Sequence, residues 1–274
     1  MLLKSILNER APGALVENAE FIDLNQHQDY VSFSFTQNGT THTNNCELLL
    51  ACDGKKSVVR QQLGLEFVGS RYPDTYIMGD FDDVTDFGDE AVLFLHKHGL
   101  IESFPLPHSK RRWVIKTDTF EKNATAELLC NLVQERTNIS LESSSATMIS
   151  GFGVQHFMAE KFVKNRVVLL GDAAHVVSPI GGQGMNLGWI DAWNLAQVIG
   201  GVLKNSPATL SLRLAAFEKR QQAITRTVAS RAAWNMKMGR RTNFPILKYL
   251  LVQVLLHPPF KKMLIQRFTM HHLE

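Results

Sequence analysis

The sequence has few of the features that mark secreted, metal-binding or membrane-spanning proteins. It contains only three cysteines among 274 residues, an odd number without the spacing of a zinc site or a redox pair. Unpaired thiols of this kind are typical of a reducing compartment, so we expect a cytoplasmic protein with no metal site. The N-terminus lacks a signal-peptide pattern, and no run approaches the roughly 18 apolar residues of a membrane span. We therefore expect no transmembrane segment.

Charge of one sign is also scarce. The formal net charge is +3 at pH 7, and the short basic runs 55–56 and 110–112 are not interleaved with aromatic residues. Nucleic-acid binding is not expected, because it needs a basic stripe that tracks phosphates. The 45% hydrophobic content suffices for one large core or two modest ones.

The most informative stretch is 166–194. Residues 167–170 form an uninterrupted apolar run, typical of a strand buried on both faces of a parallel sheet. Gly171 then allows a sharp turn, and Asp172 follows at the strand's carboxyl end, where α/β sheets bind ligands. A carboxylate at that position is a natural partner for a ribose hydroxyl.

A glycine-rich loop comes next. Pro179, Gly181, Gly182 and Gly184 precede a helix that carries Asn186. Because glycines leave the backbone exposed, N–H groups at this helix start can approach a flat or anionic ligand closely. The stretch therefore predicts a site for a phosphate-bearing cofactor.

Two motifs in order support a family resemblance. The first is Asp-Gly-Lys-Lys-Ser-Val-Val-Arg at 53–60, preceded by an apolar strand, and the second is Gly-Asp-Ala-Ala-His at 171–175 with its proline and Gly-x-Gly-x-Asn. This pattern resembles the flavin-dependent aromatic hydroxylases typified by para-hydroxybenzoate hydroxylase. Cys52 stands where that family more often has alanine.

The resemblance implies an FAD-dependent monooxygenase that consumes NADPH or NADH and hydroxylates an aromatic or similar small organic substrate through a flavin C4a-hydroperoxide. Phenolic, polyketide, quinone-precursor and drug substrates all fit. No catalytic side chain is assigned, because the flavin carries the chemistry. The residues implied in cofactor binding are Asp53, Gly54, Ser57, Arg60, Gly171, Asp172, Ala173, His175, Pro179, Gly181, Gly182, Gly184, Met185 and Asn186.

One expected element is missing. The family begins with a strand, a Gly-x-Gly-x-x-Gly turn and a helix that hold the FAD pyrophosphate. The nearest matches here, at 151–156 and 182–187, lack the third glycine or alanine. We therefore expect a chain that is incomplete alone and is complemented by an N-terminal polypeptide. The alternatives are a non-catalytic remnant or subunit of a split flavoprotein, or a flavin-dependent reductase of the same superfamily.

The expected fold class is α/β, with a partial Rossmann-like FAD-binding domain, an inserted β-sheet substrate domain and a helical C-terminus. We place the first part of the FAD-binding domain at 1–66, the substrate domain at 67–155, the second part of the FAD-binding domain at 156–203 and the helical region at 204–274. We expect helices at 1–7, 125–135, 191–203 and 211–238, a hairpin turn at 37–39 and short strands between 67 and 155. The apolar stretch 244–256 is interpreted as core rather than as a membrane contact.

Structural alternatives accompany the main assignments. Asp172 could cap a helix, and His175 is interpreted as a binding-loop residue, with a core histidine as the alternative. Arg60 could cap its helix or pair with an acid instead of contacting a phosphate or nicotinamide. His96 and His98 are expected on one face of a strand in a structural role, and Trp113 is expected to be a buried aromatic rather than a pocket wall.

Overall fold

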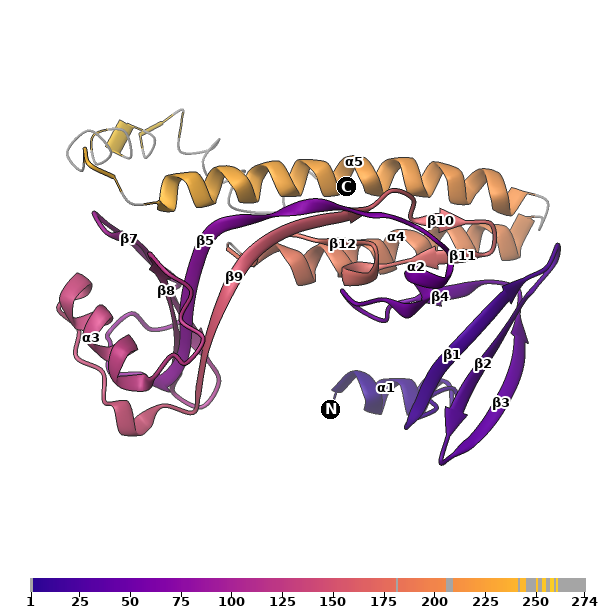
Figure 1. The fold of residues 1–274 in the computed structure, drawn as a ribbon, viewed down its shortest axis with the longest axis horizontal. Coiled ribbons are helices and arrows are strands. Elements are labelled where there is room, and N and C mark those ends of the chain that lie inside the picture. The colour runs from indigo at the N-terminus through magenta and orange to yellow at the C-terminus, as the bar shows by residue number, and fades with distance from the viewer. Residues whose placement is uncertain are drawn as a thin grey trace. The chain divides into compact units, whose positions relative to one another are not determined.

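The computed structural model describes residues 2–180, 182–205, 209–240, 242–244, 250, 253–254, 257–258 and 260. The chain is α/β, as expected (Figure 1). Its elements in order are α1 (Leu2–Arg10), β1 (Ala19–Gln26), β2 (Val31–Gln37), β3 (Thr40–Cys46), β4 (Leu49–Ala51), α2 (Val58–Gln62), β5 (Phe67–Asp82), β6 (Val92–His96), β7 (Gly99–Leu106), β8 (Lys110–Thr117), α3 (Ala126–Thr137), β9 (Met148–Ala159), β10 (Val163–Lys164), β11 (Val167–Leu169), β12 (His175–Val176), α4 (Gln183–Asn205) and α5 (Leu210–Gly239), with short 3₁₀ turns at Ser143–Ser145 and Gly171–Ala173.

The chain divides into two compact units. Unit 1 comprises residues 1–68, 158–175 and 188–222, and unit 2 comprises residues 69–157, 176–187 and 223–274. Each is described by itself below.

Unit 1 contains two small sheets. The antiparallel order β1-β2-β3 forms a meander, in which Asn38 and Gly39 turn the chain with φ of 51° and 79°, so the hairpin predicted at 37–39 is confirmed. The second sheet has the order β10-β11-β4, with β11 parallel to β4. Residues 167–169 of β11 have no exposed surface, and because successive side chains alternate between faces, the strand is buried on both, as its apolar run predicts.

The helix expected at the N-terminus is present as α1, but its apolar stripe is not packed within the described residues. None of its residues is buried, and Leu2 and Leu3 remain 74% and 61% exposed. Periodicity thus predicted the helix correctly, while the packing of its apolar face depends on neighbours that periodicity does not specify.

Unit 2 is built on a sheet of order β12-β9-β5-β8-β7-β6. We expected short strands, yet β5 runs for 16 residues and β9 for 12. Two glycines lie inside these strands at close approaches: a Cβ on Gly69 would sit 1.9 Å from the His156 carbonyl oxygen, and one on Gly151 would sit 2.0 Å from that of Glu121. These glycines therefore admit neighbouring backbone instead of ending the strand.

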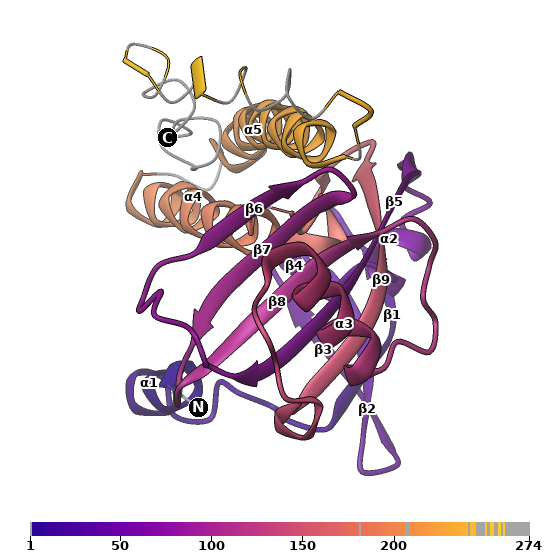
Figure 2. The same cartoon turned by 90° about the vertical axis from the view of Figure 1, so that its left-hand side faces the viewer.

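The two faces of this sheet carry different partners. Leu129 and Val133 of α3 pack on one face with Ile77, Ile115 and the fully buried Trp113, and Figure 2 shows α3 lying across the strands. Thr125 caps α3 by accepting a hydrogen bond from the Leu128 amide. The predicted helix and the buried-aromatic interpretation of Trp113 are both confirmed.

The opposite face of the sheet carries Tyr76, Leu100 and Val114, which cluster with Ile180 and Met236. This second layer therefore comes from the loop before α4 and from the C-terminal half of α5, both within unit 2.

The two C-terminal helices are longer than predicted. The helix expected at 191–203 begins already at Gln183, directly after the glycine-rich loop, and the helix expected at 211–238 is α5. The apolar stretch 244–256 lies largely outside the described residues. Within the described part of the chain, no helix combines the length and the hydropathy of a membrane span.

His96 and His98 do not share a strand face, contrary to the prediction. His96 ends β6, and His98 lies in the turn before β7, where the His98 amide donates to His96 Nδ1 at 3.4 Å. The strand ends two residues before His98, so the alternation rule does not apply to both residues.

Candidate functional site

The two sequence motifs meet at one sheet edge in unit 1. Because β4 and β11 are parallel neighbours, the loops that follow them leave the sheet at the same end. The pairing extends into the motifs, since the Leu170 amide donates to the Ala51 carbonyl at 3.0 Å. Asp53 and Asp172, far apart in the sequence, therefore both follow the carboxyl edge where open α/β sheets bind ligands.

Arg60 connects these loops directly. Its Nη1 donates to the Ala173 carbonyl and its Nη2 to the Lys55 carbonyl, each at 2.8 Å, and its guanidinium lies 3.8 Å from the centre of the Phe67 ring. The residue is only 4% exposed, and burial lowers its pKa, an effect that Asp53 partly opposes. In this structure the guanidinium links the two motif loops through backbone carbonyls, and among the described residues it neither caps its helix nor pairs with an acid.

The Asp-Gly motif shapes the start of α2. Ser57 is the N-cap and accepts from the Arg60 amide at 2.9 Å, while the exposed Asp53 accepts from the Val59 amide at 3.1 Å. Gly54 has φ +78°, and a Cβ there would meet nothing within 4 Å. The motif thus combines a capped helix start with an open backbone position.

Asp172 projects from a fixed turn. Residues 171–173 form a 3₁₀ turn that Gly171 enters with φ +55°, and the space beside Gly171 is open. Asp172 is exposed, caps no helix, and has no hydrogen-bond partner among the residues that the structure describes. Because Asp172 caps no helix, the helix-cap alternative is wrong. An unpartnered carboxylate beside an open glycine is suited to accept a hydrogen bond from a ligand hydroxyl.

His175 is buried rather than presented to a ligand. It is 1% exposed, and its Nε2 lies 2.6 Å from Asp191 Oδ2. Ala173 is also fully buried. The burial of His175 matches the core-histidine alternative, although the residue belongs to the 171–175 motif loop.

Sequence reasoning missed Asp191 and Gln221, which complete this buried network. Asp191 accepts from the Gly171 amide at 3.0 Å and from Gln221 at 2.7 Å. A signal was present, because Asp191 is an acidic residue on the apolar face of a helix, and such a residue needs donors. Its partners, however, come from two other segments, the 171–175 loop and α5.

Negative charge gathers near the end of β4, where Cys52 follows the strand. Burial raises the pKa of the Cys52 thiol, and the carboxylates of Asp53 and Asp191 raise it further. The Cys52 thiol therefore ionises less readily than a free thiol, which makes it a poorer nucleophile.

The rest of the predicted site belongs to unit 2. The Gly182 amide donates to the Pro179 carbonyl at 2.9 Å, and Asn186 donates to the Gly182 carbonyl at 3.2 Å, so this loop is closed by its own bonds. Gly181 lies outside the described residues, and Gly184 packs near Val177. Pro179, Gly182, Met185 and Asn186 are exposed. Since α4 starts at Gln183, its first amides lie at the end of this exposed loop.

Besides Trp113 Nε1 and Thr225 Oγ1, three polar side chains in the same unit are buried without a hydrogen-bond partner in the described part of the chain. They are the Tyr76 hydroxyl and the amides of Gln183 and Asn235, in residues that are 1%, 1% and 3% exposed. Tyr76 lies in the layer with Ile180 and Met236. Buried polar groups are normally paired, which makes these three candidates for contact with a bound molecule.

Comparison with known proteins agrees with this geometry. A family model described as an FAD binding domain matches residues 2–232. A flavin-dependent monooxygenase of Mycobacteroides abscessus is 29% identical over 223 residues, covering 79% of this chain and 46% of that protein. The 6-methylpretetramide 4-monooxygenase of Streptomyces rimosus is 29% identical over 209 residues, covering 73% and 37%.

A solved structure shares the fold. The anhydrotetracycline hydroxylase OxyS of Streptomyces rimosus superposes with a TM-score of 0.74 at 25% identity, covering 97% of this chain and 55% of that one. The chain spans about half the length of these relatives or less. Because the family model matches most of the chain, the chain belongs to the FAD-binding domain family, and it resembles the flavin-dependent aromatic hydroxylases within that family.

Proposed function

We propose that this chain is the FAD-binding and substrate-facing part of a monooxygenase that hydroxylates an aromatic or similar small organic molecule, with NADH or NADPH as reductant. The observation that carries the proposal is Asp172, an exposed and unpartnered carboxylate held on a fixed turn at the carboxyl edge of a parallel strand pair. The named relatives are monooxygenases, which supports the same reaction class.

Each part of the site has a proposed task. Asp172 accepts a hydrogen bond from a ribose hydroxyl of FAD. The open backbone at Gly54 and Gly171 admits the cofactor, and Asp53, Ser57 and Arg60 hold the loop beside its pyrophosphate. Bound FAD supplies the oxygen-transfer chemistry.

The loop before α4 has an electrostatic task. Amides at the start of a helix of 23 residues carry a partial positive charge, which stabilises negative charge on a ligand near Gly182 and Gly184. Pro179 lies against the flat part of the cofactor in this proposal, and Met185 and Asn186 flank it. Residues 67–155 then act as the substrate domain.

Replacing Asp172 with alanine is expected to weaken FAD binding about tenfold, the loss of roughly one hydrogen bond to a charged acceptor. The protein, co-expressed with the completing segment proposed below where the chain alone retains little flavin, is incubated with FAD and desalted, and its flavin absorbance is compared with that of the variant. Because Asp172 is exposed and unpartnered, its replacement should leave stability within about 0.5 kcal/mol. Unchanged FAD affinity would contradict the ribose contact. Flavin retention with NADPH oxidation but no hydroxylated product would favour a reductase.

We also propose that further polypeptide completes the sheet of unit 1. Strand β4 pairs on one side only among the described strands, and the apolar residues of α1 are exposed. Both features suit an added strand and a packing partner. If so, the 274-residue chain alone retains little FAD, and co-expression with a segment that carries a strand and Gly-x-Gly-x-x-Gly restores binding. Stoichiometric FAD on the chain alone would instead favour the two visible motifs as sufficient.

A further inference from the structure

Asp191 occupies a position that the cofactor contacts do not account for. Its carboxylate, 1% exposed on α4, accepts three hydrogen bonds. Oδ2 accepts from the Gly171 amide at 3.0 Å and lies 2.6 Å from His175 Nε2, while Oδ1 accepts from Gln221 Nε2 at 2.7 Å. Gln221 in turn accepts from Asn194 at 3.1 Å. All of these residues lie in unit 1.

Asp191 Oδ2 contacts residues at both ends of the turn that carries Asp172. Gly171 opens the turn and His175 follows it, so one carboxylate oxygen fixes the entry and the exit together. Charge-assisted bonds of this kind are shorter and stronger than neutral ones. The helix also comes close here, since a Cβ on Gly188, three residues before Asp191, would lie 3.5 Å from Gly171 Cα.

The network also fixes the tautomer of His175. A carboxylate only accepts hydrogen bonds, so Nε2 must carry the proton that it shares with Asp191. The other ring nitrogen, Nδ1, is buried and has no partner in the described part of the chain. A proton on Nδ1 alone would leave Nε2 and Asp191 facing each other as two acceptors.

We propose that Asp191 is a positioning residue, which acts through the Gly171 amide and His175 to hold the 171–175 loop in the conformation that presents Asp172 to FAD. The proposal rests on the FAD-binding function inferred above. Gln221 supports Asp191 from α5 and keeps the carboxylate oriented.

The test uses Asp191→Asn. An asparagine retains one oxygen for Gly171 and His175 but turns an N–H₂ group toward the Gln221 donor, so the network keeps its shape and loses its charge and one bond. We expect hydrogen exchange of the peptide containing Gly171 to accelerate about tenfold, which corresponds to about 1.4 kcal/mol of local stability. We also expect the FAD dissociation constant to rise about tenfold. ¹⁵N NMR should show a mixture of His175 tautomers, because an asparagine amide that flips to accept from Gln221 turns its N–H₂ group toward Nε2.

Three comparisons make the result specific. Val133→Ala in α3 lowers global stability but should leave both the exchange at Gly171 and the FAD affinity unchanged. Gln221→Met removes only the donor to Asp191 Oδ1 and should give the same changes more weakly. This variant replaces Asp191→Asn in the test if Asp191→Asn does not fold. The wild-type protein should show the Nε2–H tautomer of His175, and an Nδ1–H tautomer would overturn the proposal.

The outcomes separate this proposal from the function on which it rests. If the wild-type chain binds no FAD, the exchange and tautomer measurements still decide whether Asp191 fixes the loop. If Asp191→Asn leaves exchange at Gly171 and the His175 tautomer unchanged, the positioning role is wrong. If the loop loosens while FAD affinity stays constant, its link to the cofactor is wrong.

Discussion

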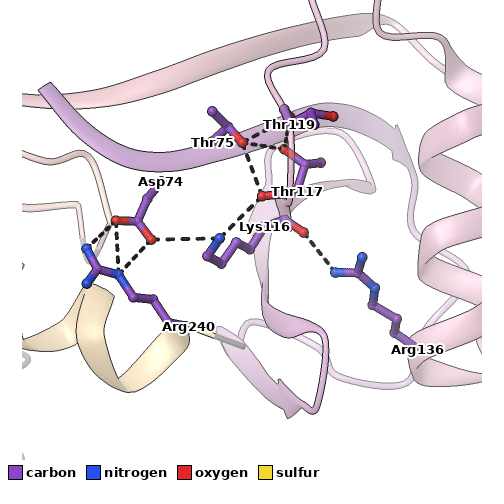
Figure 3. A network of polar contacts seen from close by, with 7 residues as sticks. All are labelled: Asp74, Thr75, Lys116, Thr117, Thr119, Arg136 and Arg240. Carbon is purple, nitrogen blue, oxygen red and sulfur yellow. Dashed lines mark hydrogen bonds and ion pairs between the residues drawn. The ribbon is translucent and has the colours of Figure 1, made fainter. Parts of the chain in front are cut away.

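Replacing Asp74 with alanine is expected to lower the free energy of unfolding by about 3–5 kcal/mol, the cost of removing one partner from a buried ion cluster. Asp74 is 1% exposed and lies between two cations (Figure 3). Arg240 donates to it at 2.6, 3.0 and 3.2 Å, and Lys116 Nζ lies 3.8 Å away. Lys116, 8% exposed, would keep its charge without its counter-ion.

The position of Arg240 explains why the effect reaches beyond one pair. Arg240 follows the last residue of α5, and the Thr242 amide just beyond it donates to the Lys97 carbonyl at 3.2 Å. The hydrogen bonds that Arg240 donates to Asp74 raise the pKa of Arg240. Without Asp74, the end of α5 loses its strongest attachment to β5, so exchange protection near residues 236–240 should fall as well.

An exposed pair of equal length provides the control. Lys4 and Glu17 also approach to 2.6 Å, but their side chains are 51% and 58% exposed. Because solvent screens such pairs, Lys4→Ala should change stability by less than about 1 kcal/mol. Urea unfolding of both variants, followed by tryptophan fluorescence, compares them. Equal effects of Asp74→Ala and Lys4→Ala would show that burial does not determine the strength of the Asp74 cluster.

Replacing Arg60 with methionine is expected to cost about 3 kcal/mol of stability, because it leaves the Ala173 and Lys55 carbonyls without their donor. Methionine fills much of the volume but makes neither bond, and it also loses the contact of the cation with Phe67. Since this residue joins the two motif loops, FAD affinity should fall in parallel. Thermal unfolding and flavin titration measure the two effects.

Two further variants test the interpretation. Arg60→Lys reaches at most one of the two carbonyls, so it should recover only part of the lost stability. Lys56→Met changes an exposed side chain in the same motif and should stay within about 0.5 kcal/mol of the wild type. A stable Arg60→Met protein with unaltered flavin binding would contradict the linking role.

Local pattern alone predicted much of this protein. The apolar run 167–170, the Asn-Gly turn at 38–39 and the leucines of α3 each form the element that their periodicity indicates, because those signals depend on neighbours within a few residues. The two motifs and their order likewise identified the FAD-binding family.

Only the tertiary structure decided how the motif residues are used. Whether a glycine ends a strand or admits another backbone depends on what lies opposite, as Gly69 and Gly151 show. Arg60, Asp191 and Asp74 find partners 113, 20 and 166 residues away, and no local periodicity encodes such a partner. The sequence thus determined the elements and the family, whereas the packing of distant segments determined which polar groups are buried, which are paired, and which, like Asp172, remain open to a ligand.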